Sequence, residues 1–315
     1  MTKDLLIVTP APHFRDGAST TGLMLNVVAA LIPAVVASAL VFGPRALVLE
    51  AACVAACVFF EWLFRKVCKR TNTIGDCSAV VTGLLLAFNL PVGMPIWMAV
   101  LGCAAAILVA KQLFGGIGQN FANPALVGRV VLLVSFGAQM TTWADPHAYL
   151  PGIEAVSGAT PLALIKHGAA IADLPPMLNM LTGVRGGCIG ETCVLALVIG
   201  GVYLMAKRVI TPTIPLTYIA TVIVLSFAFG LNPAYQVVSG GLLLGAFFMA
   251  TDYSTSPTTE SGKVIFAIGC GVITMAIRAF GSYPEGVSFS ILLMNILTPL
   301  IDRATRTKPF GGIVK

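Results

Sequence analysis

The chain has 315 residues, of which 57% are hydrophobic and only 10% are charged. Soluble domains carry about 25% charged residues, so this composition excludes an ordinary soluble protein and indicates a membrane protein. The 19 Lys and Arg residues outnumber the 13 Asp and Glu residues. They cluster in short stretches between apolar segments, which is typical of membrane topology and excludes nucleic acid as the expected partner.

Most of the apolar runs are long enough to cross the hydrocarbon core of a bilayer, which takes about 20 helical residues. They lack the alternating pattern of barrel strands, so helices are expected. The sequence therefore predicts an all-α polytopic membrane protein with about ten spans, at residues 22–43, 45–67, 78–91, 95–113, 124–140, 192–209, 213–230, 236–251, 263–279 and 288–303.

The third and eighth segments are short, rich in Gly and similar to each other. Val80–Leu86 resembles Val237–Leu244. We therefore predict two five-helix repeats, residues 1–140 and 192–315, separated by a hydrophilic stretch at 141–191. An odd number of spans per repeat makes the repeats inverted, and broken helices at matching positions then point to a binding or transport site. The alternative is that Leu-rich and Gly-rich runs align by composition alone.

The basic residues predict the orientation in the membrane. With a cytoplasmic N-terminus, that side receives fourteen of them: Lys3, Arg15, Arg65, Lys66, Lys69, Arg70, Lys111, Lys207, Arg208, Lys263, Arg303, Arg306, Lys308 and Lys315. The opposite side receives four, namely Arg45, Lys166, Arg185 and Arg278. Both termini are then cytoplasmic, and the stretch 141–191 is extracytoplasmic.

That stretch contains the tetrapeptide Ser157-Gly158-Ala159-Thr160, followed by Pro161. A threonine hydroxyl on a polar loop can carry a covalently attached group. No Lys-His-Asp arrangement lies nearby to activate it, so a separate enzyme would attach the group. The small neighbours would let such an enzyme approach the backbone. The alternative is a small-residue turn that caps a helix starting near Pro161.

A second candidate site comprises Gly115, Gly116, Asn120 and Asn123, just before Pro124. Glycines permit close approach to the backbone, and two amides offer paired donors and acceptors suited to a flavin ring edge or ribityl chain. The alternative is a re-entrant turn whose asparagines cap the fifth helix.

Three charged residues fall within or at the end of predicted spans. Asp252 closes the short eighth span, and a carboxylate at a half-helix end suits a sodium or proton site in an ion path. For Glu61 a functional role is open, and the favoured interpretation is an interfacial residue that pairs with Arg65 one helical turn later. For Arg129, a functional role and a structural ion pair are both open.

The ten-span plan and several motifs together resemble one family of flavin-bearing membrane proteins. The motifs are Pro12-His13, Gly115-Gly116 with the asparagine pair, and Ser157 to Leu162. The family comprises the D component of the Rnf complex (RnfD) and the B component of the sodium-pumping NADH:quinone oxidoreductase, and the short N-terminal leader favours the RnfD branch. The resemblance implies FMN held on Thr160 through a phosphoester and a non-covalent riboflavin near Asn120 and Asn123.

The resemblance further implies a flavin-carrying subunit of a redox-driven ion pump, which couples electron transfer between ferredoxin and NAD to Na⁺ or H⁺ translocation. The chain has no dinucleotide fingerprint and no iron–sulfur ligand motif, so it would not be a complete translocase alone. The expected partners are the other Rnf proteins (RnfA, RnfB, RnfC, RnfE and RnfG), a flavin transferase and the lipid of the bacterial cytoplasmic membrane. The rival hypothesis is a cofactor-free channel of the urea type or a small-solute transporter, neither of which would need the Thr160 loop.

Overall fold

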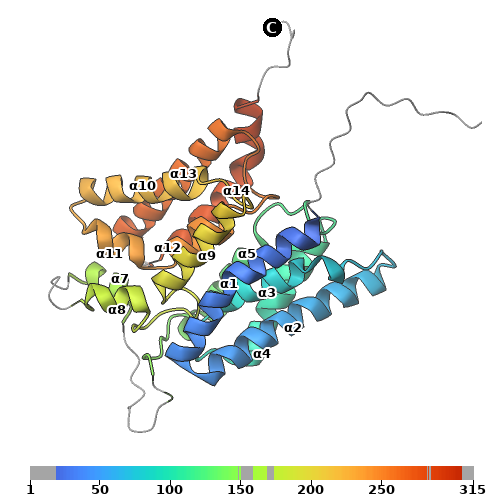
Figure 1. Ribbon diagram of the computed structural model, residues 1–315, viewed down its shortest axis with the longest axis horizontal. Coiled ribbons are helices and arrows are strands. Elements are labelled where there is room, and N and C mark those ends of the chain that lie inside the picture. The colour runs from blue at the N-terminus through green and yellow to red at the C-terminus, as the bar shows by residue number, and fades with distance from the viewer. Residues whose placement is uncertain are drawn as a thin grey trace, which may run out of the picture.

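The structure is a computed structural model that describes residues 19–147, 149, 159–168, 174–281, 283 and 285–306. The regular elements of these residues are helices (Figure 1). The first half contains α1 (Thr20–Phe42), α2 (Pro44–Val67), η1 (Ile74–Asp76), α3 (Ser78–Phe88), α4 (Ile96–Ala104), the π-helical segment η2 (Ala105–Gln112), α5 (Pro124–Ser135) and α6 (Gly137–Met140). The rest contains α7 (Pro161–Lys166), α8 (Met177–Thr182), α9 (Val194–Ala206), α10 (Thr213–Ala228), α11 (Pro233–Val238), α12 (Leu242–Leu244), the π-helical segment η4 (Gly245–Met249), α13 (Glu260–Phe280) and α14 (Val287–Ala304).

Each of the ten predicted segments overlaps at least one of these helices. Four helices, α1, α2, α13 and α14, are long and apolar enough to cross a membrane, and α3, α4 with η2, α5, α9 and α10 are shorter apolar helices. The prediction of an all-α membrane protein with several spans is therefore confirmed.

The short third and eighth segments differ from each other in one respect. The eighth is broken, as predicted, into α11, α12 and η4, with Gly240 and Gly241 both at φ +66° in the break. The third, α3, is short but runs without interruption, so the predicted break in it is wrong. Its Gly83 serves close packing instead, because a Cβ there would lie 2.7 Å from Cα of Val54 on α2.

The two halves pack side by side, with α1–α5 in one half and α10–α14 in the other (Figure 1). They meet where α1 lies against α9 and where α5 lies against α14. The contact of α1 with α9 is close, since a Cβ on Gly200 would lie 2.2 Å from the carbonyl oxygen of Ala30.

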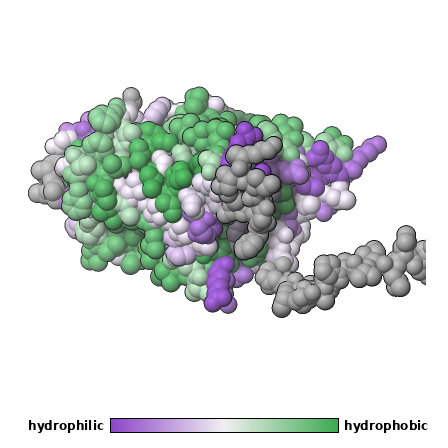
Figure 2. Space-filling model, turned by 90° about the horizontal axis from the view of Figure 1, so that it is seen from above, coloured by the Kyte–Doolittle hydropathy of each residue, from purple (hydrophilic) through white to green (hydrophobic). Residues whose placement is uncertain are grey.

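Large hydrophobic side chains cover much of the outer surface (Figure 2). Val134, Phe227 and Phe280 are 77%, 70% and 79% exposed. An apolar surface of this extent marks contact with lipid or with other membrane proteins rather than with water.

Candidate functional site

Thr160 lies at the start of the short helix α7. Its hydroxyl accepts a hydrogen bond from the backbone N–H of Ala163 at 3.3 Å, and Pro161 occupies the first helical position. The capping turn that the sequence allowed is therefore present. An oxygen in a phosphoester keeps lone pairs, so this cap is compatible with a covalent link. Ser157 and Gly158 lie outside the described residues.

Thr160 is buried and lines a cavity of about 370 Å³, which we call the threonine cavity. The volume falls in the range typical of small-molecule sites. The lining residues come from the connecting stretch, the end of α5, the loop after α13 and the start of α14: Arg129, Leu133, Met140, Thr141, Trp143, Ala159, Thr160, Ala163, Tyr283, Glu285, Ser288 and Phe289. Three aromatic side chains and one arginine therefore line the same cavity as Thr160.

Arg129 supplies positive charge in this cavity. It forms an ion pair with Glu285, and its Nη1 donates to Oδ1 of Asn89 at 2.7 Å. The sequence left a functional role and a structural ion pair open for Arg129. The structure shows the ion pair, and it also places the guanidinium in the wall of the threonine cavity.

Asn120, Asn123 and Asp252 come together in a second, smaller cavity of about 90 Å³, which we call the asparagine pocket. Asp252 follows η4, and its Oδ2 accepts from the hydroxyls of Ser254 and Thr255 at 3.0 and 3.1 Å. The pocket thus joins the second and third candidate sites of the sequence, although 129 residues (252 − 123) separate Asn123 from Asp252.

The two asparagines differ in their hydrogen bonds. Asn123 caps α5 through the N–H of Ala125 at 3.0 Å and donates to the carbonyl oxygen of Met249 at 3.2 Å. Oδ1 of Asn120 is buried without a partner among the described residues. The helix-cap interpretation therefore holds for Asn123, whereas Asn120 keeps a free acceptor for a ligand.

The two glycines do not line this pocket. Gly115 has φ +126° and Gly116 has φ +108°. A Cβ on Gly115 would lie 1.8 Å from Oε1 of Gln119, and one on Gly116 would lie 2.4 Å from Nη2 of Arg65. The structure thus shows them making room for protein side chains, and their approach to a cofactor stays a prediction.

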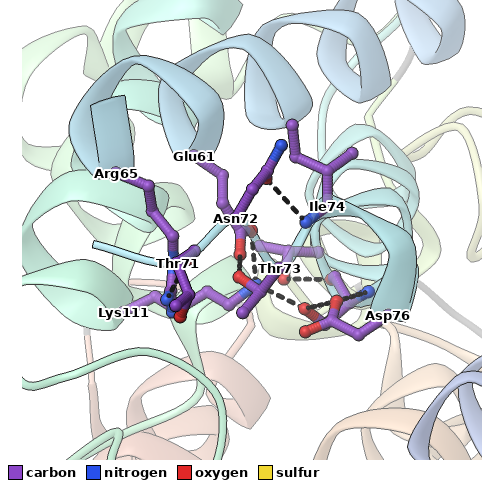
Figure 3. Close-up of polar contacts among 10 residues, drawn as sticks. Glu61, Arg65, Thr71, Asn72, Thr73, Ile74, Asp76 and Lys111 are labelled. Carbon is purple, nitrogen blue, oxygen red and sulfur yellow. Dashed lines mark hydrogen bonds and ion pairs between the residues drawn. The ribbon is translucent and has the colours of Figure 1, made fainter. Parts of the chain in front are cut away.

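Glu61 and Lys111 form a buried ion pair beside the asparagine pocket (Figure 3). Nζ of Lys111 lies 2.6 Å from Oε2 of Glu61 and 2.6 Å from Oγ of Ser78. The hydroxyl of Thr73 donates to the other carboxylate oxygen at 2.9 Å. Every charged atom of the pair thus has a close partner, which is what a buried ion pair requires.

The predicted pairing of Glu61 with Arg65 is therefore wrong. Arg65 donates to the carbonyl oxygen of Thr71 at 3.0 Å, while Glu61 faces η2 across the helix interface. Lys111 and Arg65 are also buried, so neither is the loop charge assumed in the topology prediction. Lys111 lies inside the predicted span 95–113, and that position was the available signal for a buried lysine.

Comparison with known proteins identifies the family. The model of the NQR2, RnfD, RnfE family matches residues 7–311, which include both cavities. The chain belongs to this family.

Three RnfD relatives, each the D component of its complex, illustrate how far the similarity extends. The chain is 50% identical over 308 residues to that of the Na(+)-translocating ferredoxin:NAD(+) oxidoreductase complex of Acetobacterium woodii, covering 97% of this chain and 95% of the relative. It is 42% identical to that of the proton-translocating ferredoxin:NAD(+) oxidoreductase complex of Clostridium ljungdahlii, covering 98% and 97%. It is 35% identical to that of the ion-translocating oxidoreductase complex of Escherichia coli O81, covering 96% and 98%. The predicted family and its RnfD branch are confirmed.

The unequal roles of the asparagines give a prediction. Asn123→Ala should lower the melting temperature, because it removes a helix cap worth about 1 kcal/mol and the bond to Met249. Asn120→Ala should leave the melting temperature unchanged, since its oxygen has no partner in the described part of the protein. Thermal unfolding of both variants in detergent tests this. Equal destabilisation by the two substitutions would show that Asn120 is also a structural residue.

Proposed function

We propose that this chain is the flavin-carrying membrane subunit of a redox-driven ion pump, which couples electron transfer between ferredoxin and NAD to Na⁺ or H⁺ translocation. The similarity over nearly the whole length to two proteins named for that reaction supports the proposal. The chain would act as one component of the translocase, with RnfA, RnfB, RnfC, RnfE and RnfG as partners.

The proposal that the chain carries a flavin is supported mainly by the position of Thr160, which is buried in the wall of a ligand-sized cavity. We propose that FMN is joined to this oxygen through its phosphate. Trp143, Tyr283 and Phe289 would pack against the ring system, and Arg129 would offset negative charge. The bound flavin would supply reversible electron acceptance, which no side chain supplies.

Attachment would need a flavin transferase. Among the described residues, the only hydrogen-bonding partner of the Thr160 hydroxyl is a backbone N–H, and no base contacts it. An unactivated threonine hydroxyl is a poor nucleophile. The short helix α7 holds that hydroxyl in a fixed position, which suits a site that a separate enzyme modifies.

A second, non-covalent flavin (riboflavin) at the asparagine pocket is a weaker proposal. The free oxygen of Asn120 supports it. The pocket of about 90 Å³ is smaller than the usual small-molecule site, so surrounding side chains would have to move for a ring to enter. The observed space suits an ion or a few water molecules.

A chain of contacts connects the two cavities. Arg129 in the threonine cavity bonds to Asn89, whose amide donates to Sδ of Met249 at 3.8 Å. The carbonyl oxygen of Met249 accepts from Asn123 in the asparagine pocket. Along α5, six residues separate Asn123 from Arg129, a rise of roughly 9 Å. The two cavities are therefore close and held in fixed relation, as an electron path with an adjacent ion site would need.

We also propose that residues 1–140 and 192–315 are inverted repeats on either side of the connecting stretch 141–191. The first helix of each half, α1 and α9, pack on each other, and so do the last, α5 and α14. Pairing of equivalent elements is what a two-fold relation between the halves would produce. The short α3 and the broken α11–α12–η4 occupy matching places in the order.

The proposed location is the bacterial cytoplasmic membrane, with both termini in the cytoplasm and Thr160 on the outer side. The basic residues at the end of α2 and in the turn after it, such as Lys66 and Lys69, support this orientation. Cys68 is exposed in the basic loop, and Thr142 is exposed in the connecting stretch. In intact cells, an impermeant thiol reagent should label a Thr142→Cys, Cys68→Ser variant and should not label Cys68 of the native chain. The reverse pattern would overturn the orientation.

Asp252 is proposed as part of the ion path. Its carboxylate is bonded by two hydroxyls at the end of a broken helix, and oxygen ligands of this kind suit Na⁺ or a proton. Asp252→Ala should impair ion uptake into vesicles more than electron transfer between soluble donor and acceptor. Glu260→Gln is the matched control, because Glu260 is exposed and pairs only with Lys263 and Thr213 among the described residues. Uptake equal to that of the control would remove Asp252 from the path.

The flavin proposal is tested by in-gel fluorescence of the denatured chain, produced together with a flavin transferase. A fluorescent band and a peptide spanning residues 152–166 that carries an FMN phosphodiester are expected. A dark band and an unmodified peptide would contradict flavin carriage, and the cofactor-free channel would then be the better hypothesis.

A further inference from the structure

The loop before α9 is hydrogen-bonded to the C-terminal end of the short helix α3. The N–H groups of Ile189 and Gly190 donate to the carbonyl oxygens of Leu90 and Phe88, both at 3.0 Å. A Cβ on Gly190 would lie 2.2 Å from the Phe88 ring, so only glycine fits this approach. Two carbonyl groups at and just after the end of α3 are thereby satisfied, and the residue that follows Gly190, Glu191, is buried.

The carboxyl group of Glu191 is buried beside the start of α12. The residue is 5% exposed. A Cβ on Gly241, the residue before α12, would lie 2.9 Å from its Oε2, and one on Gly187 would lie 3.0 Å from its Oε1. The carboxyl group therefore fills a space that two glycines leave open between α3 and α12.

This carboxyl group lacks the partners that a buried charge requires. Oε1 accepts only from the N–H of Cys188, at 3.3 Å, and Oε2 has no partner among the described residues. Arg185 does not pair with it, because its guanidinium donates to the backbone oxygens of Glu191 and Val238 and to Ser239. An ionised Glu191 would therefore lack the direct ion-pair and hydrogen-bond partners that stabilise a buried charge.

A second carboxyl group lies beside it. Glu285 places an oxygen within 4.8 Å of an oxygen of Glu191 and of Sγ of Cys188. One oxygen of Glu285 pairs with Arg129, and the other is buried without a partner in the described part of the chain. Two carboxyl groups at this separation, each with a free oxygen, do not readily ionise together.

We propose that Glu191 and Glu285 form a proton-binding site that holds one proton at neutral pH, with Glu191 as the protonated group. A protonated Glu191 has an O–H to donate towards Glu285, directly or through one water molecule, and a buried negative charge is removed. Burial, followed by the Glu285 carboxylate, raises the pKa of Glu191 above its usual range, which supports the geometry.

A metal ion fits the same residues less well. Arg129, Arg185 and Arg278 approach the site from α5, the loop before α9 and α13, and their positive charge would repel a metal cation, although none of them bonds to the carboxyl group of Glu191. Sγ of Cys188 lies 3.3 Å from the carbonyl oxygen of Asn89, which suits a thiol donor, and it also accepts from Nη2 of Arg129 at 3.8 Å. Burial raises the pKa of this thiol, which agrees with that assignment.

The site connects two functional regions of the chain. Glu191 lies between the end of α3 and the start of α12, and Glu285 lines the threonine cavity. A negative charge arriving in that cavity would strengthen proton binding at the pair. This last connection rests on the proposed function, whereas the proton site itself does not.

Infrared difference spectra of the purified complex test the proton site. As the pH is raised through neutrality, the C=O band of one protonated carboxyl group should disappear. Glu191→Gln should lack this band loss, and Glu260→Gln, an exposed carboxyl on α13, should keep it. In Glu285→Gln the band should disappear at a lower pH, by about one unit or more, because a neighbouring negative charge is gone.

An unchanged band loss in Glu191→Gln would overturn the proposal. If that variant fails to assemble, Glu285→Gln decides, and an unshifted band loss there would overturn it. The same titration in a Thr160→Ala background separates the proton-site proposal from the flavin proposal. The band loss should persist without covalent flavin. In a complex that retains Thr160, the midpoint potential of the flavin should depend less steeply on pH when Glu285 is replaced by Gln than when it is present.

Discussion

The Thr160→Ala variant is expected to contain no covalent FMN while still folding. The substitution deletes the only oxygen through which the proposed phosphoester could form. It also removes the hydrogen bond from the N–H of Ala163 at 3.3 Å, and losing such a cap costs about 1 kcal/mol, which is small beside the stability of a whole bundle. In-gel fluorescence should fall to background, and the melting temperature should change by only a few degrees.

Two variants control this experiment. Thr160→Ser keeps both a linking oxygen and a helix cap, so partial modification is expected if the attaching enzyme tolerates the missing methyl group. Thr142→Ala removes an exposed threonine in the same connecting stretch and should leave the fluorescence at the native level. Fluorescence retained in Thr160→Ala would mean that the flavin is attached elsewhere.

Lys111→Met is expected to be the most destabilising single substitution among those considered. Glu61 would then remain fully buried with Thr73 as its partner. Leaving one member of a buried ion pair without the other typically costs about 3–5 kcal/mol. Thermal unfolding in detergent should show a large fall in melting temperature. The same substitution at the partly exposed pair, Lys263→Met, should have almost no effect.

The double variant Glu61→Leu with Lys111→Met provides the decisive comparison. With both charges gone, the desolvation cost disappears as well, so much of the lost stability should return. If Lys111→Met instead melts like the native chain, the ion pair contributes nothing to stability. If the double variant is no better than the single one, the loss arises from packing rather than from an uncompensated charge.

The helices could be predicted closely from the sequence because they depend on local interactions. In a bilayer each helix satisfies its own backbone hydrogen bonds, so an apolar run of sufficient length marks a helix without reference to its neighbours. The predicted segment 22–43 became Thr20–Phe42, and 288–303 became Val287–Ala304. The break in α3 was predicted wrongly, because a single glycine such as Gly83 can serve helix packing as well as interruption.

The candidate residues were also found locally, but their roles were not. Ser157 to Thr160 and the asparagine pair stand out as motifs, and the structure places Thr160 and Asn120 in cavities. Glu191 and Glu285 gave no such signal. Glu191 ends the hydrophilic stretch 141–191, and Glu285 lies in the short polar stretch before 288–303. A solvated charge is the ordinary expectation in both places.

The sequence by itself determined the membrane class, the order and length of the helices and the position of the Thr160 motif. The tertiary structure decided which charges meet: Glu61 pairs with Lys111 across 50 residues of sequence rather than with Arg65 four residues away. It likewise brought Glu191 to Glu285 and Asn123 to Asp252. The physical reason is that burial makes an unpaired charge costly, so partners are set by which helix faces pack together, and helical periodicity alone does not specify that packing.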